Sequence, residues 1–310
     1  MKIVQENLLH KFKKTFYILA LIAVLLTPSA VSYAADEGDV STNAEQKVEQ
    51  NTQDQTAEKR KEILEEAKTA LDETKNALKA LDEGNNKDAL IALEKAAGKL
   101  EIILARDPSL ALAPTGVDVV HYDILGSVQD IIHITEKAEN LLEDGKVAEA
   151  RRLLKGVGKE SVISTKSLPL ATYPQAIKVA AKLIDDEKTE EAKVVLQTAL
   201  STVVVTETVV PLPVLHAGVL LEEAEALAET EERSDEDNER LAELLNEART
   251  EIEFGQALGY GDKEEFESLF KEIKTIQEKT SDGKSGTGFF DKIKSFVTSM
   301  LEGKNKTSNG

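Results

Sequence analysis

Three segments rich in β-branched residues and proline interrupt a chain that is otherwise dominated by alanine, leucine, glutamate and lysine. The segments are 109–123 (SLALAPTGVDVVHYD), 160–174 (ESVISTKSLPLATYP) and 202–214 (TVVVTETVVPLPV). Each alternates in period two, as Val117, Val119 and His121 do, which favours extended structure. Because proline cannot donate to a β-ladder, Pro169, Pro211 and Pro213 should lie at strand ends or edges. We therefore expect a mainly α fold in which three short strands pair into a small sheet against the helices.

Helical hairpins are predicted between these strands. A helix is expected from Ala57 to about Gly84, and a second from Asp88 to Asp107. Their turn recurs in the chain. Its copies are LDEGNNKDALIAL (81–93), LEDGKVAEARRLL (142–154), IDDEKTEEAKVVL (184–196) and, more weakly, LGYGDKEEFESLF (258–270). The spacing of the copies is irregular, so the sequence does not predict a strict solenoid. The alanine that the first three copies share allows close helix packing, which is a structural role.

Further helices are predicted beyond residue 214. The extension 215–279 should divide near Ser234, which can cap the second helix, and Asp262 with Glu265 forms a capping box for another. Residues 280–288 resemble a flexible linker. The last helix, 289–302, has one broad apolar stripe. Its residues are Phe289, Phe290, Ile293, Phe296, Val297 and Met300. Two hypotheses follow: this helix docks on the protein's own body, or it is an interaction helix for a partner protein or for self-association.

The N-terminus has the layout of a secretory signal peptide. Lysines precede the apolar run FYILALIAVLL, and small residues follow at Ser32 and Ala34. We expect cleavage after Ala34, with an uncleaved anchor as the alternative, although the apolar run is short for a membrane span. Residues 35–56 are polar and without periodicity, which predicts a disordered linker. The tail, 303–310, is also predicted to be disordered.

Charge and cysteine content limit the possible partners. The formal net charge is −19, and removal of a leader with four lysines and one glutamate would make it −22. Such a chain repels phosphate backbones, so nucleic acid is not an expected partner. Membrane contact is not expected either, apart from the signal peptide. The chain has no cysteine, so packing alone must hold an exported form together.

Signatures of catalysis and of metal binding are missing from the sequence. Outside the leader the histidines are His121, His133 and His216, with no HExxH motif, no cysteine ligand and no evident His/Asp cluster. SDEDNE (234–239) lacks the glycine of a calcium loop, and DGKSGTG (282–288) lacks the Walker spacing. We therefore expect no catalytic residues, no metal and no cofactor.

A candidate binding surface remains on and beside the strands. Its residues are His121, Tyr122, Tyr173, Thr206, Glu207 and Thr208. His121 is either a proton-sensitive group near a cleft or a half-buried histidine bonded to a neighbouring carboxylate or to the backbone. Residues 206–208 are either ligand contacts or the polar face of a strand.

Several stretches resemble the YfdX family of secreted bacterial proteins, in a long form. They are EDGKVAEARRLL (143–154), SLPLATYPQAIKVAAKLID (167–185), EEAKVVLQTALSTVVVTETVVPLPVL (190–215), LGYGDK (258–263) and GKSGTGFFDKIK (283–294). The resemblance covers about residues 57–300 and implies a predominantly helical protein of the Gram-negative periplasm that is tied to acid and stress responses. It assigns no catalytic residues.

The function expected from the sequence is that of a non-enzymatic periplasmic protein. It would bind peptides, unfolded clients or a partner protein in a chaperone-like role under stress. The alternative is a small-molecule or divalent-cation binder that uses its acidic surface, and a hydrolase is a third, weaker hypothesis.

Overall fold

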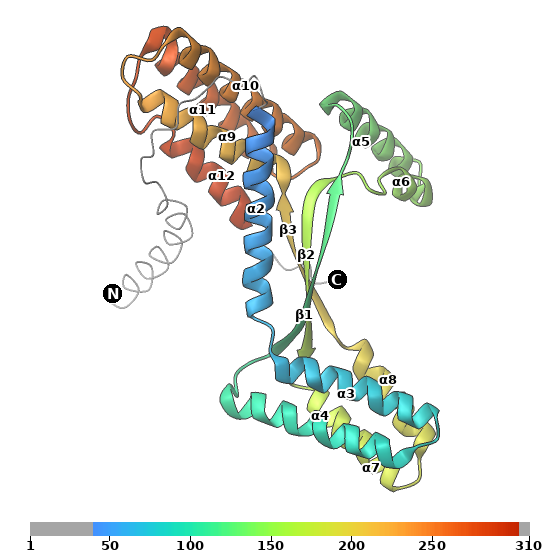
Figure 1. Ribbon diagram of the computed structural model, residues 1–310. Helices are drawn as coiled ribbons and strands as arrows, with labels where there is room; N and C mark the ends of the chain where they lie inside the picture. The colour runs from blue at the N-terminus through green and yellow to red at the C-terminus, as the bar shows by residue number, and fades with distance from the viewer. Residues whose placement is uncertain (1–39, 304–310) are drawn as a thin grey trace, which may run out of the picture. The chain divides into compact units, whose positions relative to one another are not determined.

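The computed structural model describes residues 40–303, in which groups of helices lie at both ends of a three-stranded sheet (Figure 1). The strands are β1 (Leu112–Asp123), β2 (Lys159–Pro169) and β3 (Val204–Pro211). They lie in the order β1-β2-β3, and both neighbouring pairs are antiparallel. The mainly α fold and the pairing of the three extended segments are therefore confirmed.

The register divides the strand residues between two faces of the sheet. Opposed residues of antiparallel strands project to the same face. Val119 on β1 is opposite Ile163 on β2, which is opposite Thr208 on β3. Val120 and Val162 begin the adjacent row, which ends at Val209 and projects to the other face.

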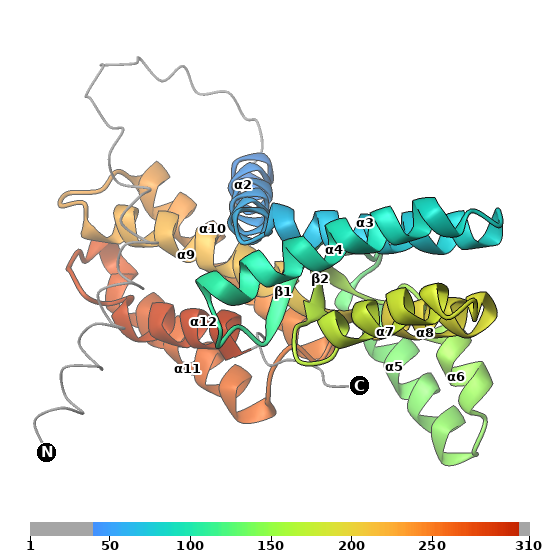
Figure 2. The same cartoon turned by 90° about the horizontal axis from the view of Figure 1, so that it is seen from below.

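Two helical hairpins pack against each other at one end of the sheet. They are α3 (Glu65–Asp82) with α4 (Asn86–Arg106), and α7 (Tyr173–Asp185) with α8 (Thr189–Ser201). Helix α3 contacts α8 and α4 contacts α7, so that one hairpin lies over the other (Figure 2). Their core is rich in alanine, and it also takes in Ala113 and Leu168 from the ends of β1 and β2. These small side chains allow the close helix approach that the sequence indicated.

A third hairpin follows β1 and precedes β2. It consists of α5 (Val128–Glu143) and α6 (Val147–Leu153). Helix α5 begins in a capping box, because the Ser127 hydroxyl accepts from the nitrogen of Asp130 and the Asp130 carboxylate accepts from the nitrogen of Ser127. All three predicted hairpin turns are therefore present.

A second core lies at the other end of the sheet. It is formed by α9 (Leu212–Glu229), α10 (Asp235–Ala257), α11 (Lys263–Thr280) and α12 (Asp291–Gly303), together with Ile163 and Val210. The predicted caps are present. The Ser234 hydroxyl accepts from the nitrogen of Asp237, and the Glu265 carboxylate accepts from the nitrogen of Asp262.

Helix α2 (Val40–Lys61) corrects one prediction. The disordered linker expected over 35–56 is wrong from residue 40 onward. Buried residues recur every four positions at Ala44, Val48, Thr52 and Thr56, and this stripe faces α9 and the sheet. The pattern was weak because two of its members are threonines. Their hydroxyls are satisfied within the helix, since each donates to the main-chain oxygen four residues earlier.

The helix expected to start at Ala57 is likewise divided in two. The chain leaves α2 after residue 61, and Leu64 is extended, with its nitrogen donating to the main-chain oxygen of Pro114 at 3.0 Å. This bond ties the turn to β1. The expected signal peptide, residues 35–39 of the expected linker and residues 304–310 of the expected disordered tail lie outside the described residues.

Residues 280–288 are held in place, whereas the sequence predicted a flexible linker. Ser281–Gly283 form one turn of 3-10 helix. The nitrogen of Gly286 donates to the main-chain oxygen of Ala228, and the oxygen of Lys284 accepts from Arg233. The glycine-rich composition suggested mobility, but the main chain of this segment is bonded to α9 and to the loop that follows it.

Candidate functional site

One face of the sheet carries exposed apolar side chains. Helix α2 contacts β1 and β2 and covers one of the two faces of the sheet. The buried residues Ile163 and Val210 of this covered face share a core with Ala44 and Val48 of the helix. On the other face Val120 is 47% exposed, Tyr122 39% and Val205 48%. We call this second face the open face.

A shallow depression of about 330 Å³ lies on the open face. It is lined by Tyr122, Gly156, Val157, Glu160, Val162, Glu207 and Val209. Two carboxylates and a phenol therefore border an apolar floor. This arrangement suits an apolar segment that also offers a positive charge or hydrogen-bond donors.

The six predicted surface residues divide into three groups. Tyr122 and Glu207 meet in the depression. His121, Thr206 and Thr208 project to the opposite face, because each is in register with a residue of that face. The structure thus brings two of the six together at the candidate site.

His121 is exposed, and its Nδ1 lies 2.8 Å from the hydroxyl oxygen of the fully buried Ser161. It is neither in a cleft nor bonded to a carboxylate.

Tyr173 is a core residue, which corrects its assignment to the binding surface. It is only 1% exposed and packs between the hairpins, beside Ile177 and Leu168. Burial raises the pKa of its phenol, and the Thr74 hydroxyl lowers that pKa in part. Its place in the motif LPLATYP reflects packing.

A half-buried polar cluster was not found from the sequence. Nζ of Lys159 lies 3.1 Å from Oε1 of Glu251, and Nδ1 of His216 lies 3.7 Å from the same oxygen. The expectation from the sequence concerned His/Asp clusters only, and the contact of His216 is with a glutamate. Burial raises the pKa of Glu251, but His216 and Lys159 lower it more, and the net pKa is below the ordinary value. No sequence spacing signals this cluster, because its members lie on β2, α9 and α10.

Tyr260 joins this cluster to the start of β2. Its hydroxyl accepts from the main-chain nitrogen of Lys159 at 3.0 Å, and burial raises its pKa well above the usual range. The Lys159 ammonium also lies 5.1 Å from the centre of the Phe254 ring. These contacts anchor the strand to α10, and we assign them a positioning role.

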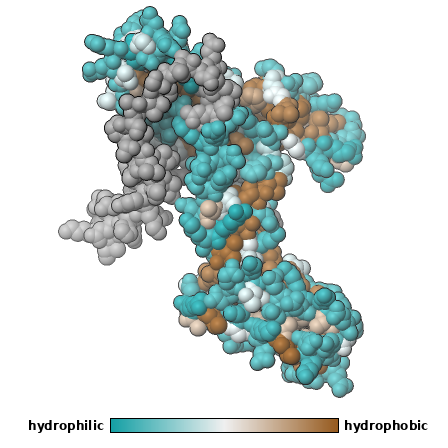
Figure 3. Space-filling model, viewed as in Figure 1, coloured by the Kyte–Doolittle hydropathy of each residue, from teal (hydrophilic) through white to brown (hydrophobic). Residues whose placement is uncertain are grey.

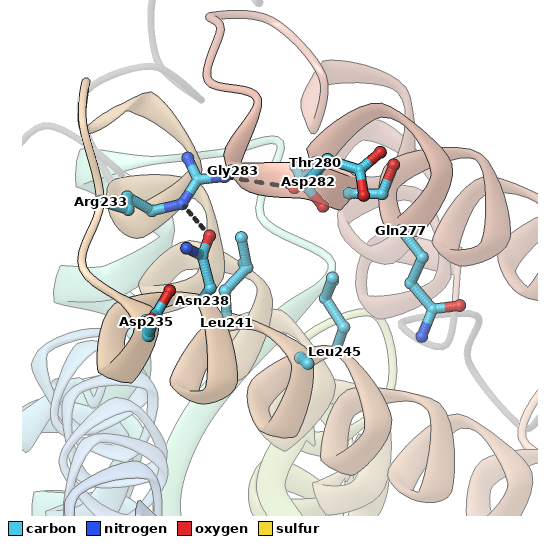
Figure 4. Close-up of a pocket in the computed structure, with 11 residues that line it drawn as sticks. Arg233, Asp235, Asn238, Leu241, Leu245, Gln277, Thr280, Asp282 and Gly283 are labelled. Carbon is cyan, nitrogen blue, oxygen red and sulfur yellow. Dashed lines mark hydrogen bonds between the residues drawn. The ribbon is translucent and has the colours of Figure 1, made fainter.

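A groove of about 540 Å³ runs between α10 and the end of α11 (Figure 4). Arg233 borders it and is only 8% exposed. Its guanidinium donates to Asn238 and to main-chain oxygens that include those of Ala228, Thr280 and Lys284. Arg233 thus satisfies carbonyl groups at the C-terminal ends of both α9 and α11, where a cation is favourable. Its nitrogens are occupied by the protein itself.

The predicted interaction helix packs within its own chain. Phe290, Ile293, Val297 and Met300 are buried in the second core, and Phe289 and Phe296 pack against it. Contact with α9 is close, since a Cβ atom at Gly218 would lie 3.2 Å from a methyl group of Val297. Lys294 also pairs with Glu225 of α9 at 2.6 Å. Of the two hypotheses for this helix, the geometry supports docking on the body.

Residues 40–303 contain no candidate metal centre and no candidate membrane span. Within that range, no three His, Cys, Asp or Glu side chains are grouped so that they could hold a metal ion. No helix in the same range is long and apolar enough to cross a membrane.

Comparison with known proteins identifies the middle of the chain. The family model described as YfdX protein matches residues 70–209, from within α3 to near the end of β3. These residues belong to the YfdX family. The match contains nearly all of the sheet and of the three hairpins, and it leaves α2 and α9–α12 outside.

A solved structure is also similar to the chain. It is that of YfdX from Salmonella Typhi, with 17% sequence identity and a TM-score of 0.35. The similarity covers 48% of this chain and 93% of that one. No curated protein matches the chain.

Proposed function

We propose that this YfdX-family protein is a non-enzymatic binding protein of the periplasm that holds apolar stretches of unfolded or partner proteins on the open face of its sheet. Its role would be chaperone-like, under stress such as acidification. The observation that carries the proposal is the exposure of Val120, Tyr122 and Val205 on one uncovered face. The ion pair of Asp118 with Lys166 lies beside them on the same face, and exposed apolar surface that is bordered by polar residues is typical of sites that bind other proteins.

The chemistry of the open face fits a polypeptide ligand. Its apolar residues come from all three strands, while Glu160 and Glu207 place negative charge beside the depression. The edge strands β1 and β3 can also offer main-chain groups to an extended segment. Export is supported by the leader-like N-terminus and by the secreted character that the resemblance to the family implies.

Suppression of aggregation tests the proposal. The purified protein should lower light scattering from a chemically denatured test protein, and the double variant Val120→Ser/Val205→Ser should lose most of this effect. The matched control is Val194→Ser, because Val194 is 61% exposed on α8, away from the open face. Equal activity of the double variant and the control would refute the assignment to this face.

Cation binding is the second candidate, favoured by the formal net charge of −19. A divalent cation that binds only the folded protein raises its melting temperature by mass action. Cation binding would be favoured over client binding by two results together. Millimolar Ca²⁺ or Mg²⁺ would raise the melting temperature, and the protein would leave the aggregation of the denatured test protein unchanged.

A further inference from the structure

The α5–α6 hairpin belongs to neither core of the described chain. Ile131 and Ala138 of α5 and Ala150 of α6 are its buried residues. None of the three is part of either hydrophobic cluster. Figure 3 shows apolar surface over this hairpin, which stands beside the sheet in Figure 1.

The repeated turn motif reveals what this hairpin lacks. The first apolar residue of the motif is buried in two copies, with Leu81 1% and Ile184 3% exposed, whereas Leu142 is 49% exposed.

The closing leucine of the motif behaves in the same way. Leu93 is 1% and Leu196 0% exposed, whereas Leu154 is 37% exposed. The alanine between them is buried in all three copies. The α5–α6 hairpin contacts the body through α10, but the leucines of its turn motif lack the cover that the other two hairpins give each other.

The two buried hairpins cover each other in a reciprocal way. The first helix of one contacts the second helix of the other, as α3 with α8 and α4 with α7. An ion pair crosses each contact, Lys193 with Asp82 at 3.2 Å and Lys178 with Glu101 at 3.1 Å. The helix contacts, although not the two ion pairs, are those of an approximate two-fold axis between two similar hairpins.

We propose that the α5–α6 hairpin docks on the α5–α6 hairpin of a second copy of this chain, in the same reciprocal arrangement. Helix α5 of each copy then packs against α6 of the other, and Leu142 and Leu154 become buried. The motif also gives the register. Arg151 follows the alanine as Lys193 does, and Glu143 follows the first apolar residue as Asp82 does. Arg151 of one copy therefore pairs with Glu143 of the other, twice per dimer.

Charge complementarity favours a second copy over other occupants. Helix α5 has four carboxylates and one lysine, whereas α6 has two arginines and one glutamate and is flanked by Lys146 and Lys155. In the reciprocal arrangement an acidic helix meets a basic one on both sides. Arg151 and Glu143 are exposed, and neither has an ion-pair partner within residues 40–303. Both charges are therefore free to make contacts with a second copy.

Charge reversal with complementation tests the proposal. In sedimentation experiments the wild-type protein should form dimers as its concentration is raised to about 100 µM. A concentration this high is needed because a small hairpin interface gives a weak dimer. Arg151→Glu and Glu143→Arg should each be monomeric, because like charges then face each other. A mixture of the two variants should form a heterodimer, because both contacts are again of opposite sign. Both residues are exposed, so circular dichroism should show unchanged folding.

Three outcomes would overturn the proposal. One is a wild-type protein that stays monomeric over this concentration range. Another is a dimer that neither reversal weakens, which would place the interface elsewhere. The third is a mixture of the two variants that remains monomeric while both are folded. Leu142→Ser offers a check without charge change and should also weaken the dimer, whereas Val194→Ser should not.

Discussion

Nζ of Lys159 on β2 lies 3.1 Å from Oε1 of Glu251 on α10, and both side chains are 19% exposed. Removal of one charge from a mostly buried pair leaves the other without compensation. We therefore expect Glu251→Gln to lower the free energy of unfolding by about 2 kcal/mol at pH 7. Thermal melting checks this. Glu267→Gln, in the exposed pair with Lys263, is the control and should change little.

The loss of unfolding free energy caused by Glu251→Gln should depend on pH. The folded-state pKa of Glu251 lies below its ordinary value of 4.5. Ionised Glu251 therefore contributes stability that is fully present above that value and is lost as the pH falls through the folded-state pKa. The difference between wild type and variant should shrink as the pH falls below about 4.5. A difference that stays constant from pH 7 to pH 3 would contradict this role of the carboxylate.

Even a conservative change of Arg233 should lower the free energy of unfolding. Its planar guanidinium donates to the ends of α9 and α11 together, which a lysine ammonium cannot reproduce. We expect Arg233→Lys to cost about 2 kcal/mol of unfolding free energy. Arg240→Lys is the control, because Arg240 makes one long exposed ion pair at 3.9 Å. Equal melting temperatures for the two variants would show that the bonds of Arg233 contribute little.

Helix α12 should be part of the stable body. Ile293→Ala removes a fully buried side chain and should cost about 3 kcal/mol, whereas exposed Ser295→Ala should be close to neutral. Truncation after Lys279 should lower the melting temperature further. An unchanged melting temperature in the truncated protein would instead indicate a detachable helix.

The central strand should not tolerate proline. Val162 of β2 is paired on both sides, with Val120 and with Val209. Proline removes a ladder donor there, so Val162→Pro should cost about 3 kcal/mol or more. Val205→Thr, on an exposed part of edge strand β3, should change stability by less than about 0.5 kcal/mol. Urea denaturation of both variants measures the difference.

Local patterns predicted the elements well where one kind of signal dominated. Alternating β-branched residues located all three strands, and Ser234 and Asp262 located helix starts. The α2 stripe was missed because threonines occupy two of its four buried positions, and polar composition outweighed the four-residue spacing. The segment 280–288 was misjudged because its order depends on Arg233, whose bonds reach residues about fifty positions away.

The candidate site was predicted in part. Tyr122 and Glu207 were identified as surface residues of strands, and strand pairing brings them to one depression. Tyr173 was misplaced because an aromatic residue in a distinctive motif can be required for packing. The cluster of His216 with Glu251 depends on how α9 crosses α10, and single-sequence periodicity carries no information about helix crossing.

Site-specific photocrosslinking tests the central claim most directly. A photoreactive phenylalanine analogue would replace Tyr122, which is 39% exposed on the open face, or Val194, which is 61% exposed on α8 and therefore the more accessible of the two. During incubation with a denatured test protein, the analogue at position 122 should form crosslinks with the client, and the analogue at position 194 should form few. Equal crosslinking at the two positions, or none at 122 while aggregation is still suppressed, would contradict binding on the open face of the sheet.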